Sequence, residues 1–185
     1  NDPVERLRGL PDDPDDLHSR YLEAEVDGVV IASIYLPNGN PRPGPKYNYK
    51  LRWIERFEAI AAELYPTDAP VVLAGDYNII PTERDAYKFE RWTEDALGHV
   101  AVREAFERLT DAGWTDALRQ CHPDETVFTF WDYFRNAFQR DAGLRIDHHL
   151  LNKAAAKRLT AAEVDRSVRG MEKTSDHAPV WISLK

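Results

Sequence analysis

The feature that most constrains the fold is an uninterrupted apolar run at residues 71–75, Val-Val-Leu-Ala-Gly, which is followed directly by Asp76. A half-buried strand alternates apolar and polar residues, whereas a short continuous apolar run is typical of a strand buried on both faces. Such a strand needs a protein layer on each side of its sheet. We therefore expect a layered protein of strands and helices, with Asp76 at the carboxyl end of a buried strand.

The segments around this run predict further strands and two amphipathic helices. Residues 21–25 and 29–35 have the composition of two strands joined by an Asp27-Gly28 turn. A first helix is indicated by apolar residues at spacings of four, three and four, namely Trp53, Phe57, Ile60 and Leu64. The remaining predictions are a loop up to about residue 17, a helix at 99–112, an extended aromatic segment at 126–134, and strands at 145–151, 163–168 and 178–184.

The composition describes one domain of ordinary size and excludes several classes of protein. The chain has 185 residues, of which 43% are hydrophobic, and shows no internal repeat. Its longest apolar stretch, residues 28–37, is about half the ~20 residues of a membrane-spanning helix, so no membrane partner is expected. The single cysteine, Cys121, excludes an internal disulfide and fits a reducing cytoplasm. Nothing signals oligomerisation, so we expect a monomer.

The acidic balance bears on the partners of the chain. A net charge of −8 argues against a protein that coats nucleic acid, because sequence-independent phosphate binding usually needs a basic surface. It does not exclude an enzyme that acts on DNA, because metal ions held by carboxylates can supply positive charge at the reacting phosphate.

Polar residues gather at the predicted ends of three strands. Asp76 and Asn78 follow the buried strand, Asp147 lies near the start of another, and Asp176-His177 comes immediately before the last. Carboxylates, an amide and an imidazole at the ends of several strands indicate a hydrolytic site. Each residue taken singly is more often a turn former. The hypothesis therefore depends on the joint pattern.

Other catalytic classes fit the sequence less well. Gly75-Asp76-Tyr77-Asn78 resembles the opening motif of binuclear metallophosphoesterases, but the Gly-Asn-His segment that this class also needs is missing. His148 and His149 are neighbours on a predicted strand, so they point to opposite faces and do not chelate one ion together. The chain also has no Gly-x-Ser-x-Gly motif and no glycine-rich phosphate loop.

Five longer blocks carry a more specific signal. They read Ile-Tyr-Leu-Pro-Asn-Gly-Asn-Pro at 34–41, Ala-Gly-Asp-Tyr-Asn-Ile-Ile-Pro-Thr at 74–82, Phe-Thr-Phe-Trp-Asp-Tyr at 128–133, Gly-Leu-Arg-Ile-Asp at 143–147, and Met-Glu-Lys-Thr-Ser-Asp-His-Ala-Pro-Val-Trp at 171–181. In this order and spacing, the chain from near residue 20 onward resembles the endonuclease/exonuclease/phosphatase superfamily, and within it the exodeoxyribonuclease III family of abasic-site endonucleases. The resemblance implies an α/β fold, the C-terminal part of a four-layer α/β sandwich in which helices flank two packed, mostly antiparallel sheets.

The resemblance also implies a role for each strand-end residue. Asp76 would activate or orient the attacking water, and Asn78 would help to hold the metal-bound phosphate. Asp147 would orient His177, whose imidazole would bind the phosphate, although a purely structural hydrogen bond between these two stays open. Mg²⁺ is the implied cofactor, with Mn²⁺ as the alternative, and the implied metal ligands are Asp76, Asn78, Asp176 and His177.

Further positions match DNA-binding residues of the family. Tyr35 corresponds to a tyrosine that contacts the phosphate and assists the leaving oxygen, and Asn38 corresponds to a nearby phosphate ligand. The resemblance implies a small apolar pocket for the abasic sugar, lined by Phe130, Trp131, Leu144 and Ile146. Such a pocket would exclude an intact nucleotide by its size. Core packing is the alternative role for these four residues. Contacts to the DNA backbone are assigned to four basic residues, Arg145, Lys46, Lys50 and Arg52.

The implied activity is metal-assisted hydrolysis of double-stranded DNA at abasic sites or 3′ ends, with incision 5′ of the lesion. Two alternatives stay open: a superfamily phosphohydrolase acting on a phospholipid or inositol phosphate, and a non-catalytic DNA-binding remnant. The family also has N-terminal strands with an Asn and a Glu that complete the metal site, and residues 1–185 contain no counterpart. We therefore expect a single domain that lacks these strands, a piece of a longer enzyme and inactive alone, rather than a genuinely shortened chain.

Overall fold

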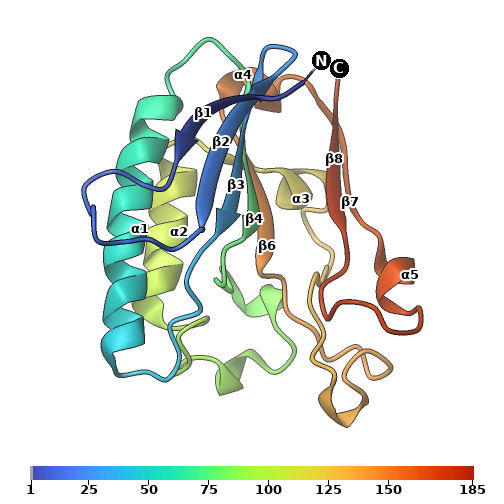
Figure 1. Ribbon diagram of the computed structural model, residues 1–185. Helices are drawn as coiled ribbons and strands as arrows, with labels where there is room; N and C mark the ends of the chain where they lie inside the picture. Colours follow the sequence, from blue (N-terminus) through green and yellow to red (C-terminus); the bar gives the residue numbers. More distant parts are fainter. Residues whose placement is uncertain (1) are drawn as a thin grey trace.

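The computed structural model describes residues 2–185, whose strands and helices form layers (Figure 1). The strands are β1 (Val4–Arg8), β2 (Tyr21–Val26), β3 (Val29–Tyr35), β4 (Val71–Asp76), β5 (Thr115–Asp116), β6 (Asp147–Leu151), β7 (Leu159–Val164) and β8 (Val180–Leu184). The α-helices are α1 (Pro45–Leu64), α2 (Val100–Asp111), α3 (Ala117–Cys121), α4 (Lys153–Ala156) and α5 (Arg166–Arg169). Short 3₁₀ helices are η1 (Glu83–Asp85), η2 (Phe89–Arg91) and η3 (Phe134–Asn136).

The layers are two β-sheets and the pair of helices α1 and α2. Six strands form one sheet in the order β1-β2-β3-β4-β6-β5, and β7 pairs with β8 in the second sheet. Among residues 2–185, only β3 and β4 pair in parallel, with α1 between them in sequence. In Figure 1, α1 and α2 lie along one side of the large sheet while β7 and β8 lie on its other side. The predicted fold class, two packed and mostly antiparallel sheets flanked by helices, is confirmed.

The buried strand β4 has the surroundings that its sequence predicts. It lies between β3 and β6 in the interior of the large sheet. On the helix side, Leu73 belongs to a core that also contains Trp53 and Phe57 of α1 and Phe106 of α2. On the other side, Val72 packs in a smaller core with residues of α3, α4, β6 and β7, with β8 packed against it.

The hairpin between β2 and β3 shows how local sequence sets the register. The turn residues Asp27 and Gly28 have φ values of 49° and 76°, and the flanking pair Val26 and Val29 closes the ladder. Positive φ at both turn positions is the geometry that matches the twist of a two-residue hairpin, and Asp-Gly adopts it readily. The predicted hairpin is confirmed.

Two secondary-structure predictions were wrong. Residues 4–8, predicted as a loop, form the edge strand β1, because backbone pairing with β2 orders a segment whose side chains are mostly exposed and therefore show no apolar alternation. The predicted strand at 163–168 is shifted, since β7 runs from Leu159 to Val164 and α5 begins at Arg166. Within residues 2–185, no helix is both long enough and apolar enough to cross a membrane.

Strand direction brings the predicted site residues to one edge of the large sheet. Because β3 and β4 are parallel, their carboxyl ends lie together, and Tyr35 is the register partner of Asp76. Because β6 runs antiparallel to β4, its first residue, Asp147, is the partner of Asp76 from the other side. The loop that leads into β8 reaches the same edge through a bridge between Phe130 and His177.

Candidate catalytic site

A cleft of about 340 Å³ lies at this edge of the large sheet. It collects side chains from the ends of β3 and β4, from the segment before β6 and from the loop before β8. The sequence-predicted residues that line it are Tyr35, Asn38, Asp76, Asn78, Phe130, Leu144, Ile146, Asp176 and His177. Residues from separate stretches of sequence therefore meet in one place.

Local backbone geometry sets the position of Asp76. A Cβ atom on Gly75 would lie 1.9 Å from the carbonyl oxygen of Ile34 on the neighbouring strand, and the φ of Gly75 is 149°. Only glycine allows β3 and β4 to approach this closely. Beyond it, Asn78 has a φ of 48°, which asparagine tolerates better than most residues. The Gly-Asp-x-Asn motif thus encodes a sharp exit from β4.

The side chains of this motif are held by hydrogen bonds. The backbone N–H and the side-chain Nδ2 of Asn78 donate to the two carboxylate oxygens of Asp76 at 2.8 and 2.9 Å. The Oδ1 atom of Asn78 accepts from Nδ2 of Asn38 at 2.9 Å. Asn38, Asn78 and Asp76 therefore form one connected chain of polar groups along the cleft.

Tyr35 lies at the open side of the cleft, where it is 53% exposed. The guanidinium carbon of Arg20 lies 4.9 Å from the centre of its ring, and Nη1 of Arg20 donates to its carbonyl oxygen at 3.2 Å. The phenol is thus accessible to a bound substrate.

His177 is bound to a carboxylate behind the cleft. Asp147 accepts from Nδ1 of His177 at 2.8 Å and from the hydroxyl of Thr129 at 2.6 Å. Burial lowers the pKa of His177, but the hydrogen bond to Asp147 and the charges of Asp147, Asp76 and Asp176 outweigh burial, so the pKa is raised overall. The arrangement favours an imidazolium facing a cleft lined by acidic groups.

The surroundings of Asp76 favour its neutral form, whereas those of His177 favour its charged form. Burial raises the pKa of its carboxyl group to about 6, and the nearby charge of Asp147 adds to this, while the Asn78 N–H, His177 and Lys50 lower it. An ionised Asp76 is therefore poorly stabilised by the protein alone. A bound cation would stabilise the ionised carboxylate against both burial and the charge of Asp147.

The donor atoms of the cleft fit an open site for a hard divalent ion. Residues 2–185 contain no group of three or more His, Cys, Asp or Glu side chains placed to hold a metal. Mg²⁺, however, needs only one or two carboxylates when water and substrate phosphate supply its other ligands. The oxygen atoms of Asp76, Asn78 and Asp176 have the appropriate chemistry for such a site.

One wall of the cleft is apolar. Leu144 and Ile146 are buried in a small cluster against which Phe130 packs. The ring of Phe130 also lies edge-on to that of His177, with 5.0 Å between the centroids. This wall borders the space in front of the imidazole, where the abasic-sugar pocket is predicted.

The structure corrects three predicted DNA contacts, Trp131, Arg145 and Lys50, which are buried and do not line the cleft. Trp131 is 1% exposed and packs against Phe128 and Phe138, and its Nε1 donates to Asp141 at 3.0 Å. Arg145 is also 1% exposed. In both cases the chain is extended, so neighbouring residues face opposite sides, and it is Phe130, Leu144 and Ile146 that face the cleft.

Arg145 instead joins a buried ion network. Its guanidinium donates to Asp85 at 2.7 Å and to Asp116 at 2.6 Å. The charge of Arg145 holds the pKa of Asp85 down at about 2, although burial opposes this. Nη1 of Arg145 also lies 3.1 Å from His148, a second buried residue of the network. Lys50, another predicted backbone contact, is likewise fully buried.

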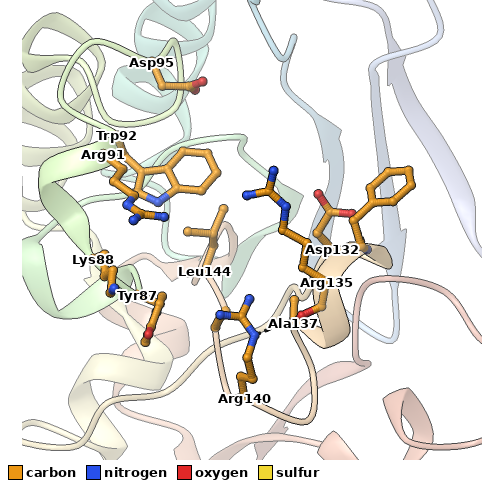
Figure 2. Close-up of a pocket in the computed structure, with 13 residues that line it drawn as sticks. Tyr87, Lys88, Arg91, Trp92, Asp95, Asp132, Arg135, Ala137, Arg140 and Leu144 are labelled. Carbon is orange, nitrogen blue, oxygen red and sulfur yellow. Dashed lines mark hydrogen bonds between the residues drawn. The ribbon is translucent and has the colours of Figure 1, made fainter.

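Sequence reasoning missed a basic groove of about 810 Å³ beside the cleft (Figure 2). The groove shares Trp92, Asp132 and Leu144 with the cleft. In Figure 2 the guanidinium groups of Arg135 and Arg140 point toward its centre. Two carboxylates and four cationic side chains line the groove, the latter being Lys88, Arg91, Arg135 and Arg140. None of these four cations forms an ion pair with any residue in 2–185. These residues come from two distant loops, so no local sequence signal could reveal the groove.

The sequence family, a related protein and a solved structure that are similar to this chain all point to the same family. Residues 2–177 match the sequence family described as the endonuclease/exonuclease/phosphatase family. Exodeoxyribonuclease III of Haemophilus influenzae is 30% identical over 190 residues, a match that covers 96% of this chain and 71% of that protein. The structure of an AP endonuclease from Archaeoglobus fulgidus superimposes with a TM-score of 0.93 at 30% identity, covering 100% of this chain and 72% of that one.

A DNA-bound structure is similar to the same degree. It is a 3′ phosphatase from Neisseria bound to a product DNA hairpin, with a TM-score of 0.93 and 38% identity. This likeness covers 99% of the present chain and 72% of the Neisseria chain.

Proposed function

The chain belongs to the endonuclease/exonuclease/phosphatase family of hydrolases, and from this membership and the geometry of the cleft we propose that it is a DNA repair nuclease acting at abasic sites and 3′ ends. On an abasic duplex it would hydrolyse the phosphodiester bond on the 5′ side of the lesion and leave a 3′ hydroxyl. The observation that carries the proposal is that Asp76 and His177 line one cleft, with Asp147 hydrogen-bonded to His177 from behind.

Each residue of the cleft would have its own role in hydrolysis. The carboxylate of Asp76, whose pKa lies at about 6, is suited to orient a water molecule and accept its proton near neutral pH. With Nδ1 of His177 bound to Asp147, Nε2 is the nitrogen left to donate to a phosphoryl oxygen, where charge builds up in the transition state. Tyr35 and Asn38 would contact the same phosphate from the β3 side.

A divalent metal ion completes this proposal. Mg²⁺ is the expected ion, with Mn²⁺ as the alternative, and Asp76, Asn78 and Asp176 would hold it together with the substrate phosphate. His177, the fourth residue predicted to bind the metal, would not ligate it while its Nε2 donates to the phosphate. When bound, such an ion would neutralise the phosphate oxygens and the leaving oxygen.

Two features of the surroundings favour DNA over a single phosphate group. The basic groove beside the cleft offers four cations that form no ion pair within residues 2–185, where a strand would present its next phosphates, and a phospholipid headgroup would not extend that far. The apolar wall of Phe130, Leu144 and Ile146 suits a sugar that has lost its base, because such a nucleotide costs little to unstack.

The decisive experiment is incision of a labelled duplex that carries one abasic site, using the complete natural chain. Parallel reactions would contain Mg²⁺, Mn²⁺ or EDTA, and an identical duplex without the lesion serves as the control. Cutting 5′ of the lesion that needs the metal ion supports the proposal. Hydrolysis of phospholipid or inositol phosphates without incision overturns it, as does tight binding of the abasic duplex with no cleavage.

A further inference from the structure

The buried ammonium group of Lys50 lies behind the cleft. Lys50 is 0% exposed, and its Nζ donates to the carbonyl oxygens of Asn78 at 2.6 Å, Ala96 at 2.9 Å and Asn38 at 3.1 Å. Three acceptors use all three N–H groups of an ammonium, whereas a neutral amine has only two. Burial lowers the pKa of Lys50 to about 7, although the charges of Asp76 and Asp95 oppose this. The three acceptors match the three N–H donors of the ammonium form.

The three carbonyl groups belong to three different loops. Asn38 follows β3, Asn78 follows β4, and Ala96 lies in the segment before α2. The first two residues carry side chains that line the cleft and are bonded to each other at 2.9 Å. The third, Ala96, is followed by Leu97, which also lines it. A single side chain of α1 therefore holds the backbone of these loops from behind, while the side chains of Asn38 and Asn78 line the cleft.

The packing around Lys50 leaves little room for another arrangement. A Cβ atom on Gly39 would lie 2.7 Å from Cδ of Lys50 and 3.1 Å from Cβ of Ala96, and the φ of Gly39 is 91°. The loop after β3 can lie directly on the lysine only because residue 39 is glycine. The loop and the lysine stem thus fit together closely.

We propose that Lys50 is a positioning residue for phosphodiester hydrolysis: it fixes the backbone of Asn38 and Asn78 so that both side chains meet the phosphate in the reactive geometry. Because it is fully buried, it does not touch the substrate itself. This inference rests on the proposed nuclease function. Its loss should lower kcat far more than it weakens DNA binding, because the groups that bind the rest of the strand lie elsewhere.

The test compares Lys50→Met with Asn152→Ala in the complete natural chain. Asn152 is a matched control because it is also 0% exposed and joins Val71, Ala69 and Thr67 at the opposite end of β4. Both variants should have a lower Tm. Only Lys50→Met should lose kcat on abasic duplex, by about 10- to 100-fold, with Kd for the duplex little changed.

A chemical variant keeps the test decisive if Lys50→Met does not fold. Lys50→Cys is made in a chain whose other cysteines, Cys121 included, are replaced with Ser. It is alkylated with 2-bromoethylamine while unfolded and then refolded, which restores an ammonium at nearly the same reach. Alkylation with 2-bromoethanol gives a neutral group of similar size. We expect kcat to return with the aminoethyl group and not with the hydroxyethyl group.

Three results would overturn the inference. They are a folded Lys50→Met protein with the wild-type kcat, full recovery with the hydroxyethyl group, and an equal loss of kcat in Asn152→Ala. Amide hydrogen exchange at residues 36–40 and 76–80 should accelerate in Lys50→Met. This measurement tests whether Lys50 holds the two loops and does not depend on enzymatic activity. The wild-type protein, assayed alongside, separates the two ideas, because its failure to incise abasic DNA would contradict the nuclease proposal alone.

Discussion

Asp147 and His177 join the two sheets of the protein: Nδ1 of the imidazole donates to the carboxylate of Asp147, at 2.8 Å to one oxygen and 3.1 Å to the other. Asp147 is the first residue of β6 in the large sheet, and His177 lies in the loop that enters β8 of the small sheet. The charge state of the imidazole therefore depends on how the two sheets pack together.

Replacing Asp147 with Asn should abolish most of the activity while leaving DNA binding nearly intact. An amide cannot stabilise the imidazolium as a carboxylate does, so the raised pKa of His177 would fall back. We expect kcat to drop by roughly 10²- to 10⁴-fold. Single-turnover incision of abasic duplex measures the rate, and fluorescence anisotropy measures Kd.

A matched control for this variant is Asp141→Asn. Asp141 also accepts from an aromatic ring N–H, that of Trp131 at 3.0 Å, but this pair is absent from the residues that line the cleft. It should keep kcat near the wild-type value. Unchanged turnover in Asp147→Asn would refute the role of the pair.

Replacing Asp76 with Asn should stabilise the protein at pH 8 although it removes activity. The folded-state pKa of Asp76 is raised from 3.8 to about 6, so ionisation of this group costs stability as the pH rises through 6. We expect a gain of about 1–3 kcal/mol at pH 8 in EDTA and little gain at pH 4. Thermal unfolding at both pH values checks this, and a variant no more stable than the wild type at pH 8 would contradict it.

Replacing Arg145 with Met should destabilise the fold rather than weaken DNA contacts. It would leave Asp85 and Asp116 buried without their cation, which costs about 3–5 kcal/mol at pH 7. Because the folded-state pKa of Asp85 is lowered to about 2, this stabilisation is present above about pH 4 and is lost as the pH falls toward 2. The destabilisation of the variant should therefore shrink on acidification.

Urea unfolding at pH 7 and pH 3 measures the effect of Arg145→Met. Arg91→Met is the control, since Arg91 is exposed and forms no ion pair with residues 2–185. Weaker DNA binding by Arg145→Met at wild-type stability would instead support a direct role of Arg145 at the DNA backbone.

Removing two cations from the basic groove should change the salt dependence of DNA binding. In Arg91→Gln/Arg140→Gln, the slope of log Kd against log salt should become shallower by roughly 0.9 for each DNA phosphate that the groove no longer neutralises, with kcat at saturating DNA unchanged. Lys153→Gln/Lys157→Gln makes the same change in net charge at α4, outside the groove. Equal slopes in the two double variants would show that the groove does not bind DNA.

The sequence by itself determined the strands of the sheet core and the motif residues at their ends. Burial of β4, the Asp27-Gly28 hairpin and the helical spacing from Trp53 to Leu64 are local patterns, since each reflects the period of one element. The same patterns could not reveal β1, because an exposed edge strand is ordered by its neighbour and not by its own apolar residues.

Only the tertiary structure decided which side chains face the cleft. Phe130 and Trp131 are adjacent and both aromatic, yet one lines the cleft and the other fills a core, because successive residues of an extended chain point to opposite sides. Lys50 and Arg145 look like surface cations in the sequence, but carbonyl groups and carboxylates from distant loops enclose them. These partners come close to Lys50 and Arg145 only when the layers pack together, and that packing depends on residues throughout the chain.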